Sequence, residues 1–227
     1  MNEMFLLFLQ IMLINIVLSG DNAVVIAMAS QKLPANQRKK AVRWGSLGAV
    51  LLRLVLTVIA VKLLEVPFIQ AAGSLLLLYI AVKLLTDQHG DREVKSATSL
   101  GGAIRTIILA DFVMSLDNVL AIAAVAKGET LLVVIGIALS IPLIVWGSTL
   151  IMKLLDRFPV LIYIGAAVLG YTAGEMVLND QVVGPMIANW SMQVHRIVPF
   201  LGAIIVIALG LMKLWTSSAG NRHGGHQ

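Results

Sequence analysis

Seven long apolar runs constrain this 227-residue chain more than any other feature. A helix needs about 20 apolar residues to cross a hydrocarbon core about 30 Å thick, because it rises about 1.5 Å per residue. The runs lie at 4–29, 41–61, 68–85, 100–126, 130–155, 160–178 and 197–215. They are rich in Leu, Ala and Gly and lack the ten-residue alternation of membrane barrels. The sequence therefore predicts an all-α membrane protein with seven transmembrane helices.

Composition agrees with a membrane protein. Hydrophobic residues make up 59% and charged residues 13% of the chain, whereas soluble domains carry about 25% charged residues. The first run has no cationic segment before it and no small-residue cleavage site, so we expect a retained helix instead of a signal peptide. We expect a single membrane domain, divided into repeat one at 4–86, repeat two at 100–178, an additional helix at 197–215 and a cytoplasmic tail at 216–227.

The distribution of Lys and Arg predicts the orientation. With the N-terminus outside, 13 of the 17 basic residues fall on the cytoplasmic side, as the positive-inside rule requires. We therefore expect a multi-pass protein of the cell membrane with its C-terminus in the cytoplasm. The chain has a pI of about 9.7. Because the basic face meets anionic membrane lipids, this high pI does not require a nucleic-acid partner. The absence of cysteine excludes disulfides and thiolate metal sites.

The chain contains an internal repeat. Shifted by 96 positions, NIVLSGDNAVVIA from Asn15 aligns with DFVMSLDNVLAIA from Asp111, with six of 13 residues identical. A shift of 92 positions aligns GSLLLLYIAVKLL from Gly73 with GAAVLGYTAGEMV from Gly165. Each copy holds three spans, an odd number, so the second copy must be inverted in the membrane. The pattern predicts two inverted three-helix repeats plus a seventh helix, with a site near the midplane where the repeats meet.

Each copy also places three oxygen-bearing side chains on one helix. Positions seven apart share a helix face, because each residue turns by about 100°. Asn15 therefore aligns with Asn22, and Asp111 aligns with Asn118. The six polar positions are Asn15, Asp21 and Asn22 in the first copy and Asp111, Asp117 and Asn118 in the second. Two antiparallel helices packed through these faces would surround one cavity with three carboxylates and three amides.

Carboxylates within a membrane helix require an explanation, because each Asp near the bilayer centre costs about 2.5 to 3.5 kcal/mol on insertion. Carboxylate and amide oxygens are the ligands of hard cations such as Mg²⁺, Ca²⁺ and Mn²⁺. We therefore expect a divalent-cation site. The alternative is structural, since the LSGDN sequence can break the helix and cap its second half. A mixed role, in which a broken helix also binds the ion through backbone carbonyls, is compatible with the functional hypothesis.

Other polar residues are accessory candidates. Arg53, within the second span, is either a counter-ion that neutralises the site or a residue that snorkels toward the interface. Glu175 is either an outer gate or ligand, or a solvated helix end. The two histidines of the tail NRHGGHQ either bind a transition metal weakly or belong to a disordered tail. Glycines such as Gly45 and Gly170 predict close contact between helices.

The motif-bearing segments LSGDNAVVIAMAS from Leu18 and ADFVMSLDNVLAIAAVA from Ala110 resemble the paired helices of the TerC family, closest to its YjbE-type members. The resemblance covers essentially all seven helices. It implies Mn²⁺ as substrate, because bacterial members are associated with manganese efflux and in some cases supply metal to exported enzymes. The family's acidic motif falls here on Asp21, Asn22, Asp111, Asp117 and Asn118. Asn15 stands where the second copy has Asp111, so the charge of the site is asymmetric.

We expect a transporter that exports a divalent cation by alternating access, with Asp carboxylates releasing the metal as protons enter from outside. No GxxxxGK loop for ATP is present, and no HExxH, GxSxG or cysteine nucleophile indicates an enzyme. We therefore expect no catalytic residues and no cofactor. The alternatives are an exporter of an organic solute or amino acid, and a scaffold or metallation partner without its own flux. Candidate partners are a second copy of the chain or secretion-associated membrane proteins.

Overall fold

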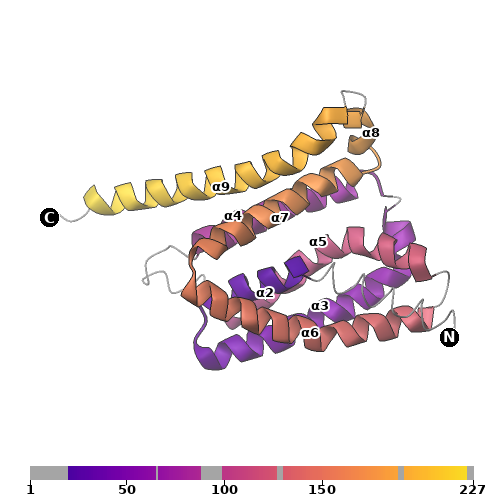
Figure 1. The fold of residues 1–227 in the computed structure, drawn as a ribbon, viewed down its shortest axis with the longest axis horizontal. Coiled ribbons are helices and arrows are strands. Elements are labelled where there is room, and N and C mark those ends of the chain that lie inside the picture. Colours follow the sequence, from indigo (N-terminus) through magenta and orange to yellow (C-terminus); the bar gives the residue numbers. More distant parts are fainter. Residues whose placement is uncertain (1–19, 65, 88–98, 127–129, 189–191, 224–227) are drawn as a thin grey trace.

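The computed structural model describes residues 20–64, 66–87, 99–126, 130–188 and 192–223, and this part of the chain is helical with short turns and no strand (Figure 1). The all-α prediction is confirmed for it. The helices are α2 (Gly20–Gln31), α3 (Ala35–Leu64), α4 (Ile69–Asp87), α5 (Leu100–Ala126), α6 (Thr130–Arg157), α7 (Val160–Asn179), α8 (Val183–Ala188) and α9 (Met192–His223).

Three of the described helical segments are long and apolar enough to cross a membrane, namely α4, α7 and residues Arg196–Lys213 of α9. The predicted run at 100–126 coincides with α5. The second run, predicted at 41–61, is shorter than α3, which begins at Ala35. The reason is that hydrophobicity marks where a helix meets lipid, whereas the polar residues 35–40 continue the same backbone hydrogen bonding. Of the first run, at 4–29, residues 4–19 lie outside the described residues.

The helices form two groups (Figure 1). One group contains α2, α3, α5 and α6, and the other contains α4, α7 and α9. A common apolar core of fully buried side chains joins them, with Met28 from α2, Leu77 from α4, Ile107 from α5 and Leu169 from α7. The polar motifs of α2 and α5 therefore lie inside the first group, next to this core.

Polar contacts at the helix ends define the helix directions. Arg38, near the start of α3, pairs with Asp156, near the end of α6, so these two helices are antiparallel. The N–H of Ala71, near the start of α4, donates to Asp180, which follows the end of α7. Helices α4 and α7 are therefore antiparallel as well. These are the helix pairs that occupy matching positions in the two sequence repeats.

Small residues bring the helices close together, as the sequence predicted. A Cβ atom placed on Gly45 of α3 would lie 2.7 Å from the side chain of Ile107 on α5. A Cβ atom on Gly170 of α7 would lie 2.6 Å from the carbonyl oxygen of Gly202 on α9. Backbone therefore meets backbone at the α7–α9 contact, the kind of close approach that small residues allow between membrane helices.

Candidate functional site

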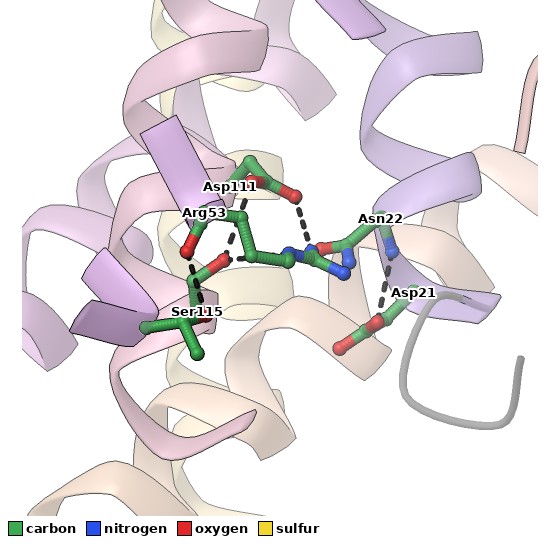
Figure 2. A network of polar contacts seen from close by, with 6 residues as sticks. Asp21, Asn22, Arg53, Asp111 and Ser115 are labelled. Atoms are coloured by element: carbon green, nitrogen blue, oxygen red, sulfur yellow. Dashed lines mark hydrogen bonds and ion pairs between the residues drawn. The ribbon is translucent and has the colours of Figure 1, made fainter. Parts of the chain in front are cut away.

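Arg53 of α3 lies at the centre of a buried polar network between α3 and α5 (Figure 2). Its Nη2 donates to Oδ1 of Asp111 at 2.5 Å, and its Nε donates to Oγ of Ser115 at 3.0 Å. The Ser115 hydroxyl in turn donates to Oδ2 of Asp111 at 3.2 Å. Arg53 is only 1% exposed and Asp111 6% exposed. Each oxygen of the Asp111 carboxylate thus accepts one hydrogen bond, Oδ1 from the cationic Arg53 and Oδ2 from the neutral Ser115.

Helical geometry explains how α5 supplies two partners to one guanidinium. Asp111 and Ser115 are four residues apart, so they share one face of the helix, one turn apart. Arg53 reaches this face because α3 packs along α5, where Gly45 allows close approach. A buried Arg is tolerated when its charge is paired and its N–H groups are bonded. The network therefore depends on the contact between the second helix of one repeat and the first helix of the other.

Helix α2 supplies Asp21 and Asn22 on the side of the Arg53 guanidinium away from Ser115 (Figure 2). Asp21 is half-buried, and its Oδ1 accepts the backbone N–H of Asn22 at 2.8 Å. Its carboxylate is attracted electrostatically by Arg53 and repelled by Asp111. The repeated acidic motifs therefore lie close enough to influence one another, with one Arg between them.

The structure bears on the capping alternative in both copies of the motif. In the first copy, the Asn22 N–H donates to the residue directly before it, Asp21, whereas a capping side chain accepts an N–H two or three residues further on, so this bond does not indicate a cap. Asp117, the counterpart of Asp21 in the second copy, lies within α5, which is continuous from Leu100 to Ala126. No helix end is present there to cap. The broken-helix interpretation is therefore wrong for the second copy.

The space between α2 and α5 at this point is narrow. A void of about 160 Å³, lined by Asn22, Val25, Ile26, Ile107 and Asp111, has no room for a sphere the size of water. In the part of the chain that the structure describes, Asp111 is therefore packed closely against α2 and paired with Arg53. We call this arrangement the closed conformation.

The predicted site residues that the structure describes occupy three places. The structure gathers Asp21, Asn22, Asp111 and the accessory Arg53 into one region (Figure 2). Asn118 is buried on α5, two turns beyond Asp111 on the same face. Glu175 lies on the exposed surface of α7.

Two predicted residues lie outside the described part of the structure, namely Asn15 and the side chain of Asp117. Among the side chains that are described, no three His, Asp or Glu residues gather as a metal-binding group. The expected cavity with three carboxylates therefore stays a prediction. The described donors in the region, carboxylate, amide and hydroxyl oxygens, are those that suit a hard divalent cation.

Ser115 is a site residue that the sequence hypothesis did not include. It is fully buried and bonds to both members of the Arg53–Asp111 pair. Two signals in the sequence pointed to it: Ser115 follows Asp111 by four residues, and Ser19 occupies the same place in the first copy. Neither signal is specific, because serine in a membrane helix more often bonds to its own backbone.

The chain is similar to known membrane proteins over most of its length. Residues 1–218 match the sequence profile described as the integral membrane protein TerC family. The chain is 48% identical over 194 residues to the uncharacterized membrane protein YjbE of Bacillus subtilis, covering 86% of this chain and 88% of that protein. It is 28% identical over 166 residues to the UPF0053 inner membrane protein YgdQ of Escherichia coli, covering 65% of this chain and 69% of that protein. No solved structure matches the chain.

Proposed function

Because the chain belongs to the TerC family of integral membrane proteins, we propose that it transports a divalent metal cation, with Mn²⁺ as the substrate, out of the cell. The observation that carries the proposal is the buried Arg53–Asp111 pair beside a second aspartate, Asp21, inside a helix bundle. Ionisable residues buried in membrane helices mark ion pathways when they face the bundle interior. The oxygen donors favour a hard cation, and the family resemblance favours Mn²⁺.

The arrangement of the helices supports alternating access between two inverted repeats. Helices α3 and α6 are antiparallel, and so are α4 and α7, as inverted copies require. The network joins α3 of one proposed repeat to α5 of the other. A rocking motion of one repeat against the other opens the narrow space between α2 and α5 alternately to each side. Seven spans, with the N-terminus outside, complete this architecture.

In the proposed transport cycle, Arg53 pairs with Asp111 when no metal ion is bound there. In the closed conformation its guanidinium satisfies Asp111, so the unloaded site carries no isolated buried carboxylate there. An incoming Mn²⁺ replaces Arg53 at Asp111 and takes oxygen ligands from Asp21, Asn22, Asp117 and Asn118. On the outer side, protonation of the aspartates weakens the site and releases the metal. Outward movement of a divalent ion against an inside-negative potential costs about 4.6 kcal/mol per 100 mV, so a coupled proton supplies useful drive.

Mn²⁺ uptake into inside-out proteoliposomes tests the proposal. We expect saturable uptake by the wild type, competition by Ca²⁺ and Mg²⁺, and acceleration by a proton gradient. Asp111→Asn and Asp117→Asn keep the side-chain size and remove one charge, and we expect each to reduce uptake at least about tenfold. Asp156→Asn removes one exposed carboxylate at the end of α6, outside this network, and is the matched control.

Three outcomes contradict parts of this proposal. Absence of Mn²⁺ uptake by folded wild-type protein would favour an organic solute or amino-acid exporter, or a metallation partner without flux. Uptake that Asp111→Asn leaves unchanged would remove the described network from the ion path. Uptake that does not respond to a proton gradient would exclude the coupling while leaving the metal transport intact.

A further inference from the structure

A second polar feature lies at one end of the α3–α6 pair, apart from the Arg53 network. The start of α3 and the end of α6 enclose an open groove of about 450 Å³. Its lining residues are Ala35, Arg38, Lys39, Val42 and Arg43 from α3 and Val145, Thr149, Met152, Lys153 and Asp156 from α6. On each helix these residues follow one another at steps of one, three or four positions, so each set forms one continuous face.

The groove combines a cationic rim with an apolar floor. Four basic side chains, Arg38, Lys39, Arg43 and Lys153, meet one acidic side chain, Asp156, which leaves a formal charge of +3. The floor includes the buried side chains of Val42 and Met152, at 3% and 8% exposure. Solvated Lys and Arg residues on a helix surface would not require such a floor. The groove therefore suits an amphipathic anion.

One cation of the rim is held in place before any ligand arrives. Arg38 donates through Nε to the carbonyl oxygen of Leu33 at 2.8 Å and through Nη1 to Asp156 at 3.2 Å. Asp156 also accepts a bond from Gln31 at 3.3 Å, which ties α2 to the same end of the bundle. Lys39, Arg43 and Lys153 are exposed along the rim. Hydrogen bonds therefore hold one cation of the groove, Arg38, in place, and the other three cations are on exposed side chains that can adjust to a ligand.

We propose that this groove binds an anionic phospholipid, with the headgroup phosphate at the cationic rim and the first part of the acyl chains on Val42 and Met152. Basic pockets between membrane helices on the cytoplasmic side bind such headgroups. A volume of about 450 Å³ lies in the range of pockets that hold a whole small organic molecule, and a free phosphate ion would fill only a small part of it. This inference does not depend on the transported substrate.

Native mass spectrometry of the full-length protein, purified in detergent, tests the assignment. The protein is titrated with phosphatidylglycerol or with phosphatidylcholine of the same chain length, and retained lipids are counted. We expect one phosphatidylglycerol to be retained in preference to phosphatidylcholine. The triple variant Lys39→Gln, Arg43→Gln, Lys153→Gln should lose this preference, with binding at least about tenfold weaker. The triple variant Lys32→Gln, Lys40→Gln, Arg105→Gln removes the same residue types outside the groove lining, and it should bind like the wild type.

A variant that should bind the lipid more strongly separates the effect of charge from the effect of misfolding. Asp156→Asn removes the one acidic side chain that lines the groove, so it should strengthen phosphatidylglycerol binding. Inorganic phosphate at millimolar concentration distinguishes the two sources of a phosphate group. Displacement of the lipid by phosphate would overturn the lipid assignment in favour of a free anion. Equal loss in both triple variants would also overturn it, because the attraction would then be diffuse.

Discussion

At the scale of single residues, the buried guanidinium of Arg53 and the buried carboxylate of Asp111 compensate each other's charge. They share one direct hydrogen bond, and Ser115 bridges them through two more. Removal of one partner from such a pair typically destabilises a protein by about 3 to 5 kcal/mol, because it leaves an uncompensated buried charge. Asp21, electrostatically coupled to Arg53, reduces this penalty when Asp111 is lost. The pair is thus stable in the structure, and in the proposed transport cycle a divalent ion competes with Arg53 for Asp111.

Ser115 gives a sharp test of this network. Ser115→Ala removes the hydroxyl that accepts from Arg53 and donates to Asp111, and hydrogen bonds to charged groups contribute about 1.5 to 3 kcal/mol each. We expect Ser115→Ala to lower the free energy of unfolding in detergent by about 1.5 to 3 kcal/mol. Ser148→Ala is the matched control, because Ser148 is equally buried but donates to the carbonyl oxygen of Val145 in its own helix. Its effect should be about 0.5 kcal/mol or less. Equal losses in both variants would contradict the role of Ser115.

At the scale of helices, Asp180 joins three elements on the side of the bundle opposite the groove. Its carboxylate accepts the N–H groups of Val182, Val183 and Ala71 at 2.9, 3.0 and 3.1 Å, and so holds the turn before α8 against the start of α4. Burial raises the pKa of this carboxyl, but the backbone donors lower it by more, and the net result is a pKa below the ordinary value of 3.8. The ionised form is therefore the one that the folded state prefers.

The lowered pKa of Asp180 predicts an acid-sensitive contact. A folded pKa below the unfolded pKa stabilises the fold above about pH 4, and this stabilisation is lost as the pH falls through the folded pKa. We expect the thermal midpoint of the wild type in detergent to fall with pH in this acid range. Asp180→Asn should have a lower midpoint at neutral pH and a smaller slope in acid. Parallel pH profiles for the two proteins would show that Asp180 does not contribute.

The contact between α7 and α9 depends on glycine. Gly170→Ala places a methyl group 2.6 Å from the carbonyl oxygen of Gly202, where a backbone atom, not a flexible side chain, must move. We expect a loss of about 1 to 3 kcal/mol in the free energy of unfolding. Gly101→Ala is the control, since no atom lies within 4 Å of the added methyl group. A neutral Gly170→Ala variant would mean that α9 is free to shift on α7.

At the scale of the whole molecule, the two helix groups and the antiparallel pairs fit an up-and-down membrane bundle (Figure 1). This arrangement places the start of α3 and the end of α6 at one end of the bundle, and Asp180 at the other. The basic groove then faces the cytoplasm and the turn before α8 faces outward, if the excess of Lys and Arg decides the orientation as it does in most multi-pass proteins.

Cysteine labelling tests this orientation against a clean background, because the chain contains no cysteine. Gln181→Cys and Lys40→Cys each introduce one thiol at an exposed position. In intact cells we expect a membrane-impermeant maleimide to label Gln181→Cys and to leave Lys40→Cys unlabelled until the cells are opened. The reverse pattern would invert the topology and the proposed direction of transport. Labelling of both positions in intact cells would contradict the up-and-down arrangement.

The sequence predicted the helical fold of the described residues and singled out Asp111 for a simple physical reason: the hydrophobic length of a span and the repeated polar motif are local properties of the chain. The extent of α3 and α9 was not predictable to the residue, because polar ends continue a helix beyond its apolar part. The competing roles of Arg53, counter-ion or snorkelling side chain, also could not be separated from sequence, since both place an Arg in an apolar run. The structure buries Arg53 against Asp111.

The sequence by itself thus determined the class of protein and the repeated acidic motif, whereas the hard divalent cation stays a prediction. The tertiary structure decided which of these side chains meet. It brought Arg53, Asp111 and Ser115 together from α3 and α5, and it formed the basic groove from the start of α3 and the end of α6. Such juxtapositions depend on how helices far apart in the chain pack, and packing is set by the fit of whole helix faces and by the contacts that glycines allow.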